Sequence, residues 1–289
     1  MTDQITLQIP AKINLSLDIT GRRADGYHTL RSVFQTVGVY DRLTLTKTGA
    51  DTPLSLTCDT EGVPCDSRNL VWKAAVCLLG DEPRGLSMHL EKGIPSQAGM
   101  GGGSADCAAA LLGIRRLLGL AVSDTELHGL AARLGADVAF FLRGGTVLCA
   151  GIGEQLSEVR ALPQSVIVLA KGSEGVSTPA AYRALDQLGT AQPADTDNVL
   201  AALETGDAAA VFAVCGNHFD AVTDLPEISR IRAIMRENGM RPVLSGSGAA
   251  VFGGCESRAQ AEHCAAALRE AGLAFVQVAE TVSHGVTVI

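Results

Sequence analysis

The chain has 289 residues, 47% of them hydrophobic, and a formal net charge of −8 from 31 acidic and 23 basic side chains. Its length and apolar content predict two domains with substantial cores, and its acidity excludes a uniformly basic face for nucleic acid or an anionic membrane. No run approaches the roughly 18 apolar residues of a membrane span, and the polar start lacks a signal-peptide pattern. We therefore expect a cytoplasmic protein without nucleic-acid or membrane partners.

The first half of the chain is predicted to open with paired β-strands. Apolar and polar residues alternate in four segments, as in strands with one buried face; they cover 5–9, 13–19, 32–37 and 42–48. Between the second and third segments, GRRADGYHTL at 21–30 interrupts this pattern with glycines, charges and two aromatic rings. We expect a loop there that carries functional side chains.

Helical patterns follow these strands. Residues 69–79 have helical spacing, 86–90 are strand-like, and a glycine run then leads into a helix that extends to about Leu118. Ser123 is predicted to start a further helix, because Glu126 three residues later completes a capping-box pattern.

The second half is predicted to be a separate α+β domain. An apolar run typical of a buried strand begins after Pro163, so we place the division between domains 1–157 and 158–289. The polar stretch 186–198 is expected to be a surface connection. Helices are predicted at 178–188, 207–219, 227–238 and 258–272, and strands at 165–170, 241–246, 249–254 and 273–280.

The eight cysteines are scattered, with no C-x-x-C pair and no tight cluster with histidine. This spacing is typical of small packing residues in a reducing compartment rather than of a disulfide framework. No metal-ligating residues are predicted.

The stretch AGMGGGSADCAAALLG at 98–113 places four glycines directly before a helical pattern. Unpaired N–H groups and the dipole at a helix start stabilise an anion, and glycine lets that anion approach the main chain. Ser104 is expected to cap the helix or to contact a phosphate or its metal. The stretch matches neither the P-loop nor the Rossmann fingerprint, and close helix packing explains its glycines equally well on these residues alone.

Four motifs in order carry a family resemblance. They are AKINLSLDITGRRADGYHTL at 11–30, the glycine run after Ile94 and Pro95, LGADVAFFLRGG at 134–145 and LSGSGAAVFGG at 244–254. Together they resemble the GHMP kinases over most of the chain. The resemblance implies an α+β fold with an N-terminal β-rich α/β domain, a C-terminal ferredoxin-like α+β domain and an active site in the cleft between them.

Two residues depart from the family's glycine loop, which usually reads Gly-Leu-Gly-Gly-Gly-Ser-Ser. Met100 replaces the leucine and Ala105 the second serine, while Ser104 keeps the first. A cradle of backbone N–H groups is unaffected by these changes, because it does not depend on side chains.

The motif at 11–30 is similar to one branch of the GHMP kinases. It implies ATP-dependent phosphorylation of the 2-hydroxyl of a cytidine diphosphate-linked methylerythritol, in the non-mevalonate route to isoprenoid precursors. Two other functions are compatible with the glycine-rich stretch. Another small-molecule GHMP kinase, such as a homoserine or mevalonate kinase, has no use for a cytosine-binding loop, and a non-catalytic nucleotide-binding protein needs neither Lys12 nor Asp137. We expect a monomer or a weak homodimer.

Lys12 and Asp137 are the candidate catalytic residues. An ionised Asp137 beside an apolar stretch is costly without a partner. From spacing alone, a helix cap for Asp137 and an exposed strand-end cation for Lys12 are the favoured explanations. The resemblance implies instead that Asp137 is the general base and that Lys12 orients it and lowers the pKa of the substrate hydroxyl.

The resemblance also implies an aromatic subsite for cytosine. Tyr27 would stack on the base, His28 would recognise its edge, and Tyr182 would cover its second face; on sequence alone, an anchor of the loop in the core explains Tyr27 and His28 equally well. The late glycine turn is expected to bring backbone donors to the cleft, with a tight hairpin as its alternative. The implied substrate contacts are Asn14, Tyr27, His28, Asp137, Thr178, Tyr182, Gly246, Ser247 and Gly248.

ATP with Mg²⁺ is the implied cofactor, because a divalent cation commonly bridges phosphate oxygens. Asn69 and Lys92 would lie near the nucleoside, although an ordinary surface lysine explains Lys92 equally well. The implied ATP contacts are Asn69, Lys92, Pro95, Ser96, Gln97, Ala98, Gly99, Met100, Gly101, Gly102, Gly103, Ser104, Ala105 and Asp106.

Overall fold

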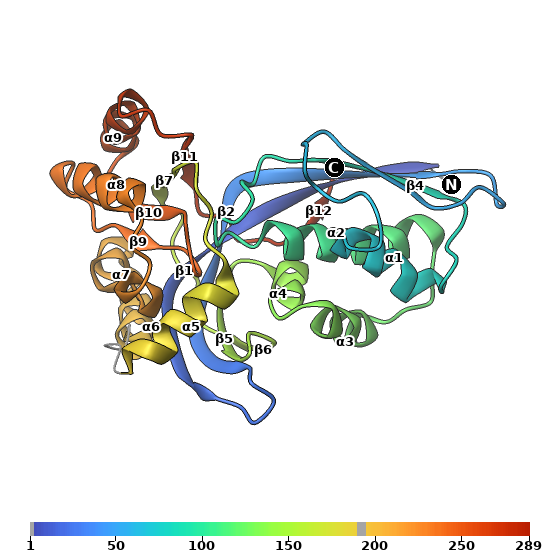
Figure 1. Ribbon diagram of the computed structural model, residues 1–289, viewed down its shortest axis with the longest axis horizontal. Coiled ribbons are helices and arrows are strands. Elements are labelled where there is room, and N and C mark those ends of the chain that lie inside the picture. Colours follow the sequence, from blue (N-terminus) through green and yellow to red (C-terminus); the bar gives the residue numbers. More distant parts are fainter. Residues whose placement is uncertain (1–2, 190–194) are drawn as a thin grey trace.

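The computed structural model describes residues 3–189 and 195–289, which form two lobes, each built on one β-sheet with helices against it (Figure 1). The larger sheet has the strand order β12-β1-β2-β4-β3, with β5 and β6 continuing from β2 and β8 beside β1. Its strands are β1 (Gln4–Arg22), β2 (His28–Lys47), β3 (Ser55–Cys58), β4 (Leu86–Glu91), β5 (Thr146–Gly151), β6 (Gln155–Glu158), β8 (Gly216–Asn217) and β12 (Thr287–Val288).

Two long antiparallel strands replace the four short strands predicted at the start of the chain. Pairing between β1 and β2 shifts register between Pro10 and Ala11, which pair with Tyr40 and Val37. Such an irregularity bends a strand without ending it. Residues of β1 and β2 beyond it share a core with the smaller sheet, as Ile13 and Val33 do with Ile167. Arg22 pairs with His28 at the far end, and the loop predicted at 21–30 is therefore shorter than expected.

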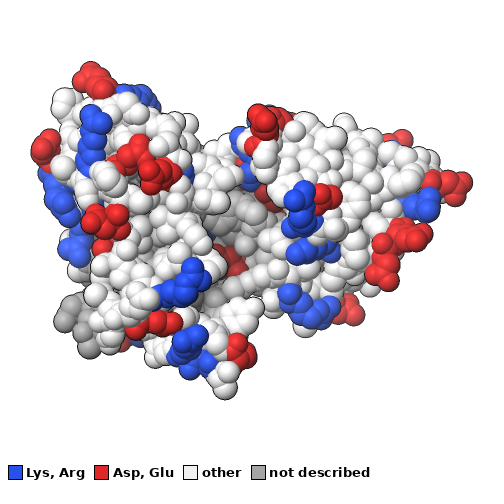
Figure 2. Space-filling view, viewed as in Figure 1, with Lys and Arg blue, Asp and Glu red and all other residues white. Residues whose placement is uncertain are grey.

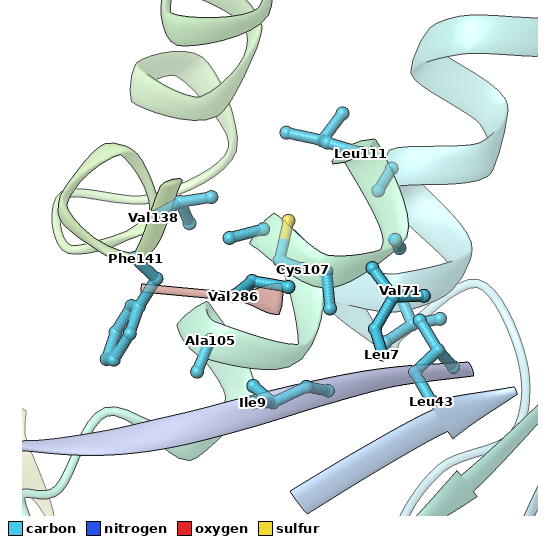
Figure 3. Close-up of a cluster of buried hydrophobic side chains, with 14 of the residues drawn as sticks. Leu7, Ile9, Leu43, Val71, Ala105, Cys107, Leu111, Val138, Phe141 and Val286 are labelled. Carbon is cyan, nitrogen blue, oxygen red and sulfur yellow. The ribbon is translucent and has the colours of Figure 1, made fainter. Parts of the chain in front are cut away.

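Helix α2 (Gly102–Leu118) lies against the larger sheet, and α1 (Leu70–Leu79), α3 (Asp124–Leu134) and α4 (Val138–Arg143) pack on α2 (Figure 1). Figure 3 shows Leu7, Ile9 and Leu43 of the strands packed with residues of α1, α2 and α4. Gly113 lets α2 approach the sheet, because a Cβ there would lie 2.5 Å from Leu45 and 2.8 Å from Leu7. Close helix packing thus explains this glycine of the stretch 98–113.

The predicted helix starts of this lobe are confirmed. The side chain of Asn69 caps α1 by accepting a hydrogen bond from the backbone N–H of Val71. Ser123 and Glu126 form the reciprocal bonds of a capping box at α3. Both caps satisfy N–H groups that a helix start leaves without intrahelical partners.

The smaller sheet has the order β11-β7-β10-β9, all antiparallel. This order and the helices between the strands match the ferredoxin-like pattern expected for the second half. The strands are β7 (Val166–Lys171), β9 (Val243–Leu244), β10 (Val251–Gly254) and β11 (Phe275–Glu280), and the helices are α5 (Thr178–Leu188), α6 (Thr196–Thr205), α7 (Ala208–Val214), α8 (Pro226–Glu237) and α9 (Arg258–Glu270).

The helix predicted at 207–219 is wrong in its second half. Helix α7 ends at Val214, after which β8 pairs with β1 and a short 3₁₀ helix, η1 (His218–Ala221), follows. Asn217 favours this break, since its side chain accepts from the N–H of Phe219 and donates to the carbonyl oxygen of Leu244. A side chain that bonds to the backbone in this way competes with helix formation.

The C-terminal strand β12 returns to the larger sheet, where Val288 pairs with Leu7 of β1. The proposed division between domains 1–157 and 158–289 stays a prediction, and strands β8 and β12 beyond it pair with β1. The predicted surface connection at 186–198 is wrong at both ends, because 186–188 belong to α5 and 196–198 begin α6, where Thr196 is buried. Positions 190–194 lie outside the described residues. Within 3–189 and 195–289, no helix combines the length and apolar character needed to cross a membrane.

Candidate active site

A cleft of about 970 Å³ lies between the glycine-rich segment 95–104, strand β1 and helix α5. Figure 2 shows the hollow between the two lobes with charged side chains around it. Its volume is in the range of small-molecule and cofactor sites. Most of the residues singled out from the sequence line this cleft; Asn69, Ala105, Asp106 and Gly248 do not.

Lys12 and Asp137 are brought together at one wall of this cleft. The Nζ atom of Lys12 lies 3.9 Å from Oδ2 of Asp137. Lys12 is 3% exposed, inside strand β1, so the alternative of an exposed strand-end cation is wrong. Asp137 occupies the N-cap position of α4, but its side chain makes no capping hydrogen bond. The alternative of a helix cap is therefore wrong for its carboxylate, which is left to face Lys12.

Asn14 holds the ammonium group of Lys12. The two side chains are two residues apart on β1 and share one face of the sheet, and Nζ of Lys12 donates to Oδ1 of Asn14 at 2.6 Å. The same oxygen accepts from the N–H of Gly246 at 2.8 Å, and the Asn14 amide donates to Ser32. Asn14 lines the cleft as expected, but its side-chain oxygen already has two partners.

Burial lowers the pKa of Lys12 below its ordinary value of 10.5, although the nearby Asp137 carboxylate opposes this shift. The ammonium also lies 4.8 Å from the centre of the Phe34 ring, at a distance typical of a cation–π contact. A cation with a lowered pKa beside a carboxylate can stabilise an alkoxide or transfer a proton.

The glycine-rich turn leads into the N-terminus of α2 with its first N–H groups unpaired by the helix. Gly101 is the N-cap, in a left-handed conformation with φ of 75°, and no side chain caps the helix. Of the two roles expected for Ser104, the helix cap is therefore wrong, and contact with a phosphate or its metal stays a prediction. Ser104 lies inside the first turn and lines the cleft. A Cβ built on Gly103 would meet nothing within 4 Å, so this side of the turn is open for a phosphate group.

The glycine-rich turn is also fixed to the second lobe. The carbonyl oxygens of Gln97 and Ala98 accept from the N–H groups of Ala249 and Ala250. A Cβ on Gly99 would lie 1.9 Å from the carbonyl oxygen of Ser245, so only glycine fits there. Glycine in this turn thus permits close contact between the lobes next to the open start of α2.

The turn Gly246, Ser247 and Gly248 connects the antiparallel strands β9 and β10, so the hairpin alternative is correct for its structure. The N–H groups of Gly246 and Gly248 are already bonded to Asn14 and to the carbonyl oxygen of Ser245. These two N–H groups are therefore not the free donors that we expected. Ser247 lines the cleft, and its hydroxyl lies 2.8 Å from that of Thr178 on α5.

Behind the glycine-rich turn, Lys92 forms ion pairs with Asp41 and Asp106. Its side chain is buried, so the surface-lysine alternative is wrong, and Asp106 faces Lys92 instead of lining the cleft. Asp41 also accepts from the N–H groups of Gly93 at 2.6 Å and Ile94 at 2.7 Å. Burial tends to lower the pKa of Lys92, but the charges and hydrogen bonds of Asp106 and Asp41 raise it overall.

The aromatic residues differ from the expected base sandwich. Tyr27 is 62% exposed, so it does not anchor the loop in the core. His28 stacks on Tyr182, with ring centroids 4.5 Å apart and planes 16° apart, and so covers the face of Tyr182 that was predicted for the base. Burial and the Asp137 charge raise the pKa of Tyr182 to about 12, which keeps its ring neutral.

Sequence reasoning missed several charged residues that line the cleft. Arg22, Arg133 and Arg183 line it with Lys12 and Lys92, whereas Asp137 and Asp186 are its carboxylates. Neither Arg133 nor Arg183 forms an ion pair with any residue in the described ranges. Asp186 lies four residues after Tyr182 and Arg183 lies next to it, so the helical period from Thr178 and Tyr182 could have indicated both as cleft residues.

Asp41, which binds Lys92 behind the cleft, carried no local signal in the sequence, since its partners lie about fifty residues away.

Comparison with known proteins shows to which family the chain belongs. Residues 69–145 match the GHMP kinases N terminal domain and residues 199–274 the GHMP kinases C terminal domain. Among curated relatives, the 4-diphosphocytidyl-2-C-methyl-D-erythritol kinase of Desulfitobacterium hafniense is 40% identical over 98% of each chain. The protein of that name from Moorella thermoacetica is 40% identical over 93% of this chain and 96% of its own.

A solved structure agrees with these relatives. The crystal structure of a 4-(cytidine 5'-diphospho)-2C-methyl-D-erythritol kinase superposes with a TM-score of 0.77 at 33% identity, covering 96% of this chain and 98% of that one. The two-domain fold expected from the motifs is therefore confirmed. The chain belongs to the GHMP kinase family and, within it, to the 4-diphosphocytidyl-2-C-methyl-D-erythritol kinases.

Proposed function

We propose that this enzyme transfers the terminal phosphoryl group of ATP to the 2-hydroxyl of 4-diphosphocytidyl-2-C-methyl-D-erythritol, in the non-mevalonate route to isoprenoid precursors. The observation that carries the proposal is the pairing of Lys12 with Asp137 at 3.9 Å in a cleft that also contains the open start of α2. A nucleotide-binding protein without catalysis needs no such pair, whereas transfer to an alcohol needs a proton acceptor and a nearby positive charge.

In this proposal Asp137 accepts the proton of the substrate hydroxyl. Because no helix N–H bonds its carboxylate, both oxygens remain available on the cleft side. Lys12, held by Asn14, favours the ionised form of the hydroxyl oxygen and keeps Asp137 oriented. Removal of either group is expected to reduce the rate of transfer more than the binding of ATP.

Backbone groups at the start of α2 bind the phosphates of ATP in the proposed complex. The N–H groups of Gly102, Gly103 and Ser104 precede the first intrahelical bond, which Ala105 donates to Gly101. ATP bound there supplies the electrophilic phosphorus. The chain contributes by positioning the phosphates and by electrostatics. Arg133 lines the same cleft and adds positive charge there.

Mg²⁺ is proposed to bind with ATP. The hydroxyl of Ser104 and the carboxylate of Asp137 line the same cleft, and oxygen ligands of this kind are those that Mg²⁺ prefers. Within the described residues no group of three histidine, cysteine or carboxylate side chains is placed to hold a metal. We propose that the hydroxyl of Ser104 would contribute to holding the metal with the phosphates, and that Asp137, as the proton acceptor, would lie beside it without binding it.

The opposite end of the cleft is proposed to bind the cytidine diphosphate. Tyr27 and His28 are positioned for contact with the base, and Arg22 and Arg183 provide positive charge for a diphosphate. The paired hydroxyls of Thr178 and Ser247 lie between this end and Lys12 in the proposed complex, where they would contact the polyol. A cytoplasmic location and a monomeric or weakly dimeric state complete the proposal.

A coupled assay of ADP release tests the proposed function. Purified enzyme with ATP and Mg²⁺ is given the cytidylated substrate, homoserine or mevalonate in parallel. Turnover that depends on the cytidylated substrate supports the proposal. Turnover of either other alcohol indicates a different small-molecule kinase, and ATP binding without turnover of any of the three indicates a non-catalytic protein.

A further inference from the structure

Helix α5 holds the imidazole of His28 in two ways. Tyr182 stacks on the ring at 4.5 Å between centroids, and Oδ1 of Asp186 lies 2.7 Å from Nε2 of the same ring. Tyr182 and Asp186 are four residues apart and so share one face of α5. Stacking fixes the plane of the imidazole, and the contact with Asp186 fixes its orientation within that plane.

The contact with Asp186 decides which ring nitrogen carries the hydrogen. The hydrogen bond with His28 holds the pKa of Asp186 below its ordinary value of 3.8, so this carboxylate is ionised at neutral pH. An ionised carboxylate only accepts hydrogen bonds, and Nε2 of His28 must therefore be the donor. In a neutral imidazole the other nitrogen, Nδ1, is then an acceptor.

Nδ1 of His28 is available to a ligand in the cleft. It has no hydrogen-bond partner within residues 3–189 and 195–289, and it is not fully buried. His28 lines the cleft beside Tyr27. An acceptor at this place pairs with an amino group but repels a carbonyl oxygen, and this is the difference between cytosine and uracil at position 4 of the ring.

We propose that Asp186 is a positioning residue that sets base specificity: it fixes His28 as the Nε2–H tautomer, so that Nδ1 selects a pyrimidine with a 4-amino group over one with a 4-carbonyl group. This inference deepens the proposed function and rests on it. Asp186 acts through His28 and needs no contact with the substrate.

Asp186 has a second partner that the test must separate from the first. Its Oδ2 atom lies 3.3 Å from Nη1 of Arg22, whose side chain is 60% exposed. Loss of this exposed ion pair is expected to change substrate affinity through the diphosphate, without a preference for one base. Arg22→Gln is therefore the matched control, since it removes the ion pair and keeps the contact with His28.

The test compares kcat/KM for the cytidylated substrate and for the same compound with uracil in place of cytosine. The unaltered enzyme is expected to prefer cytosine by about 10- to 100-fold. In Asp186→Asn the side-chain amide can donate to Nε2 as well as accept from it, so the ring hydrogen is no longer confined to Nε2 and the preference is expected to fall to within about threefold of unity. Asp186→Glu and Arg22→Gln are expected to keep the preference.

Nitrogen-15 NMR of the ring of His28 gives a readout independent of turnover. When the ring is neutral, the unaltered enzyme is expected to show its hydrogen on Nε2, and Asp186→Asn a shift toward Nδ1. A doubly protonated ring in the unaltered enzyme overturns the proposal, as does an unchanged base preference in Asp186→Asn. An equal loss of preference in Arg22→Gln also overturns it. No turnover of the cytidylated substrate by the unaltered enzyme contradicts instead the proposed function, which separates the two failures.

Discussion

Lys92 and Asp106 meet behind the glycine-rich turn, with Nζ 2.6 Å from Oδ2. The ammonium group of Lys92 also forms an ion pair with Asp41, so two carboxylates lie against one buried ammonium. The acids are not equivalent. Asp41 also accepts two backbone N–H groups, whereas Oδ1 of Asp106 is buried with no hydrogen-bond partner in the described part of the chain.

This asymmetry predicts different costs for two matched substitutions. Asp41→Asn is expected to lower the free energy of unfolding by about 3 kcal/mol, because it leaves a buried ammonium poorly compensated and loosens the segment that precedes Pro95. Asp106→Asn is expected to cost about 1 kcal/mol or less, since Lys92 keeps Asp41. Urea unfolding of both variants checks this order. Equal costs, or a larger cost for Asp106→Asn, contradict the assignment of Asp41 as the main partner.

The pH dependence of stability should report on Asp106. Burial raises the pKa of Asp106 well above its ordinary value of 3.8, Asp41 raises it further, and Lys92 opposes the shift. A raised pKa means that the folded state binds the proton more tightly than the unfolded chain, so the contribution to stability is complete at low pH and is lost as the pH rises through the raised value.

Unfolding of the unaltered enzyme and of Asp106→Asn is to be compared between about pH 4 and pH 8. The stability of Asp106→Asn relative to the unaltered enzyme is expected to increase with pH across this interval, because the variant has no proton to release. A relative stability that is constant, or that decreases with pH, shows that Asp106 does not hold a raised pKa in the folded protein.

Lys12 and Asp137 are expected to affect turnover far more than folding. Asp137→Asn and Lys12→Ala should each reduce kcat by about 10²- to 10⁴-fold, the range for loss of a general base or its partner. The double variant is expected to lose little more than either single variant, because the two side chains act as one unit. Lys73→Ala on the exposed face of α1 is the control. Near-normal transfer in both single variants, with circular dichroism showing a folded protein, contradicts the catalytic assignment.

Two glycines of the turn separate phosphate binding from folding. A Cβ on Gly103 meets nothing within 4 Å, so Gly103→Ala is expected to keep or raise the melting temperature, since alanine favours a helix by about 0.5–1 kcal/mol over glycine. It should nevertheless weaken ATP binding, because the new methyl group occupies the open side of the turn. Calorimetric titration with ATP measures this loss.

Gly101→Ala is the matched comparison. Gly101 has a φ of 75°, and a Cβ there would lie 2.6 Å from Phe141, so this variant is expected to lose about 2 kcal/mol or more of stability. ATP affinity that is unchanged in Gly103→Ala would show that phosphates do not lie at this start of α2.

The sequence by itself determined much of this protein. The hydrophobic periods and caps predicted α1, α2, α3, α5, α8, α9 and the four strands of the smaller sheet, because these signals are local. They did not predict α6, and they predicted α7 as too long. Ser123 and Glu126 form their capping box, and the glycine run precedes α2 as expected. The four motifs indicated the family and most residues of the cleft, including Lys12 and Asp137.

Only the tertiary structure decided which partners these residues have. The partners of Lys92 and His28 lie far away in the sequence, at Asp41 and Asp186, and no local period relates such positions. The stacking of His28 on Tyr182 and the pairing of β12 with β1 likewise join positions that are far apart in the sequence. A spacing rule describes the shape of one element, whereas the protonation state and orientation of a side chain depend on groups that only folding brings within a few ångströms.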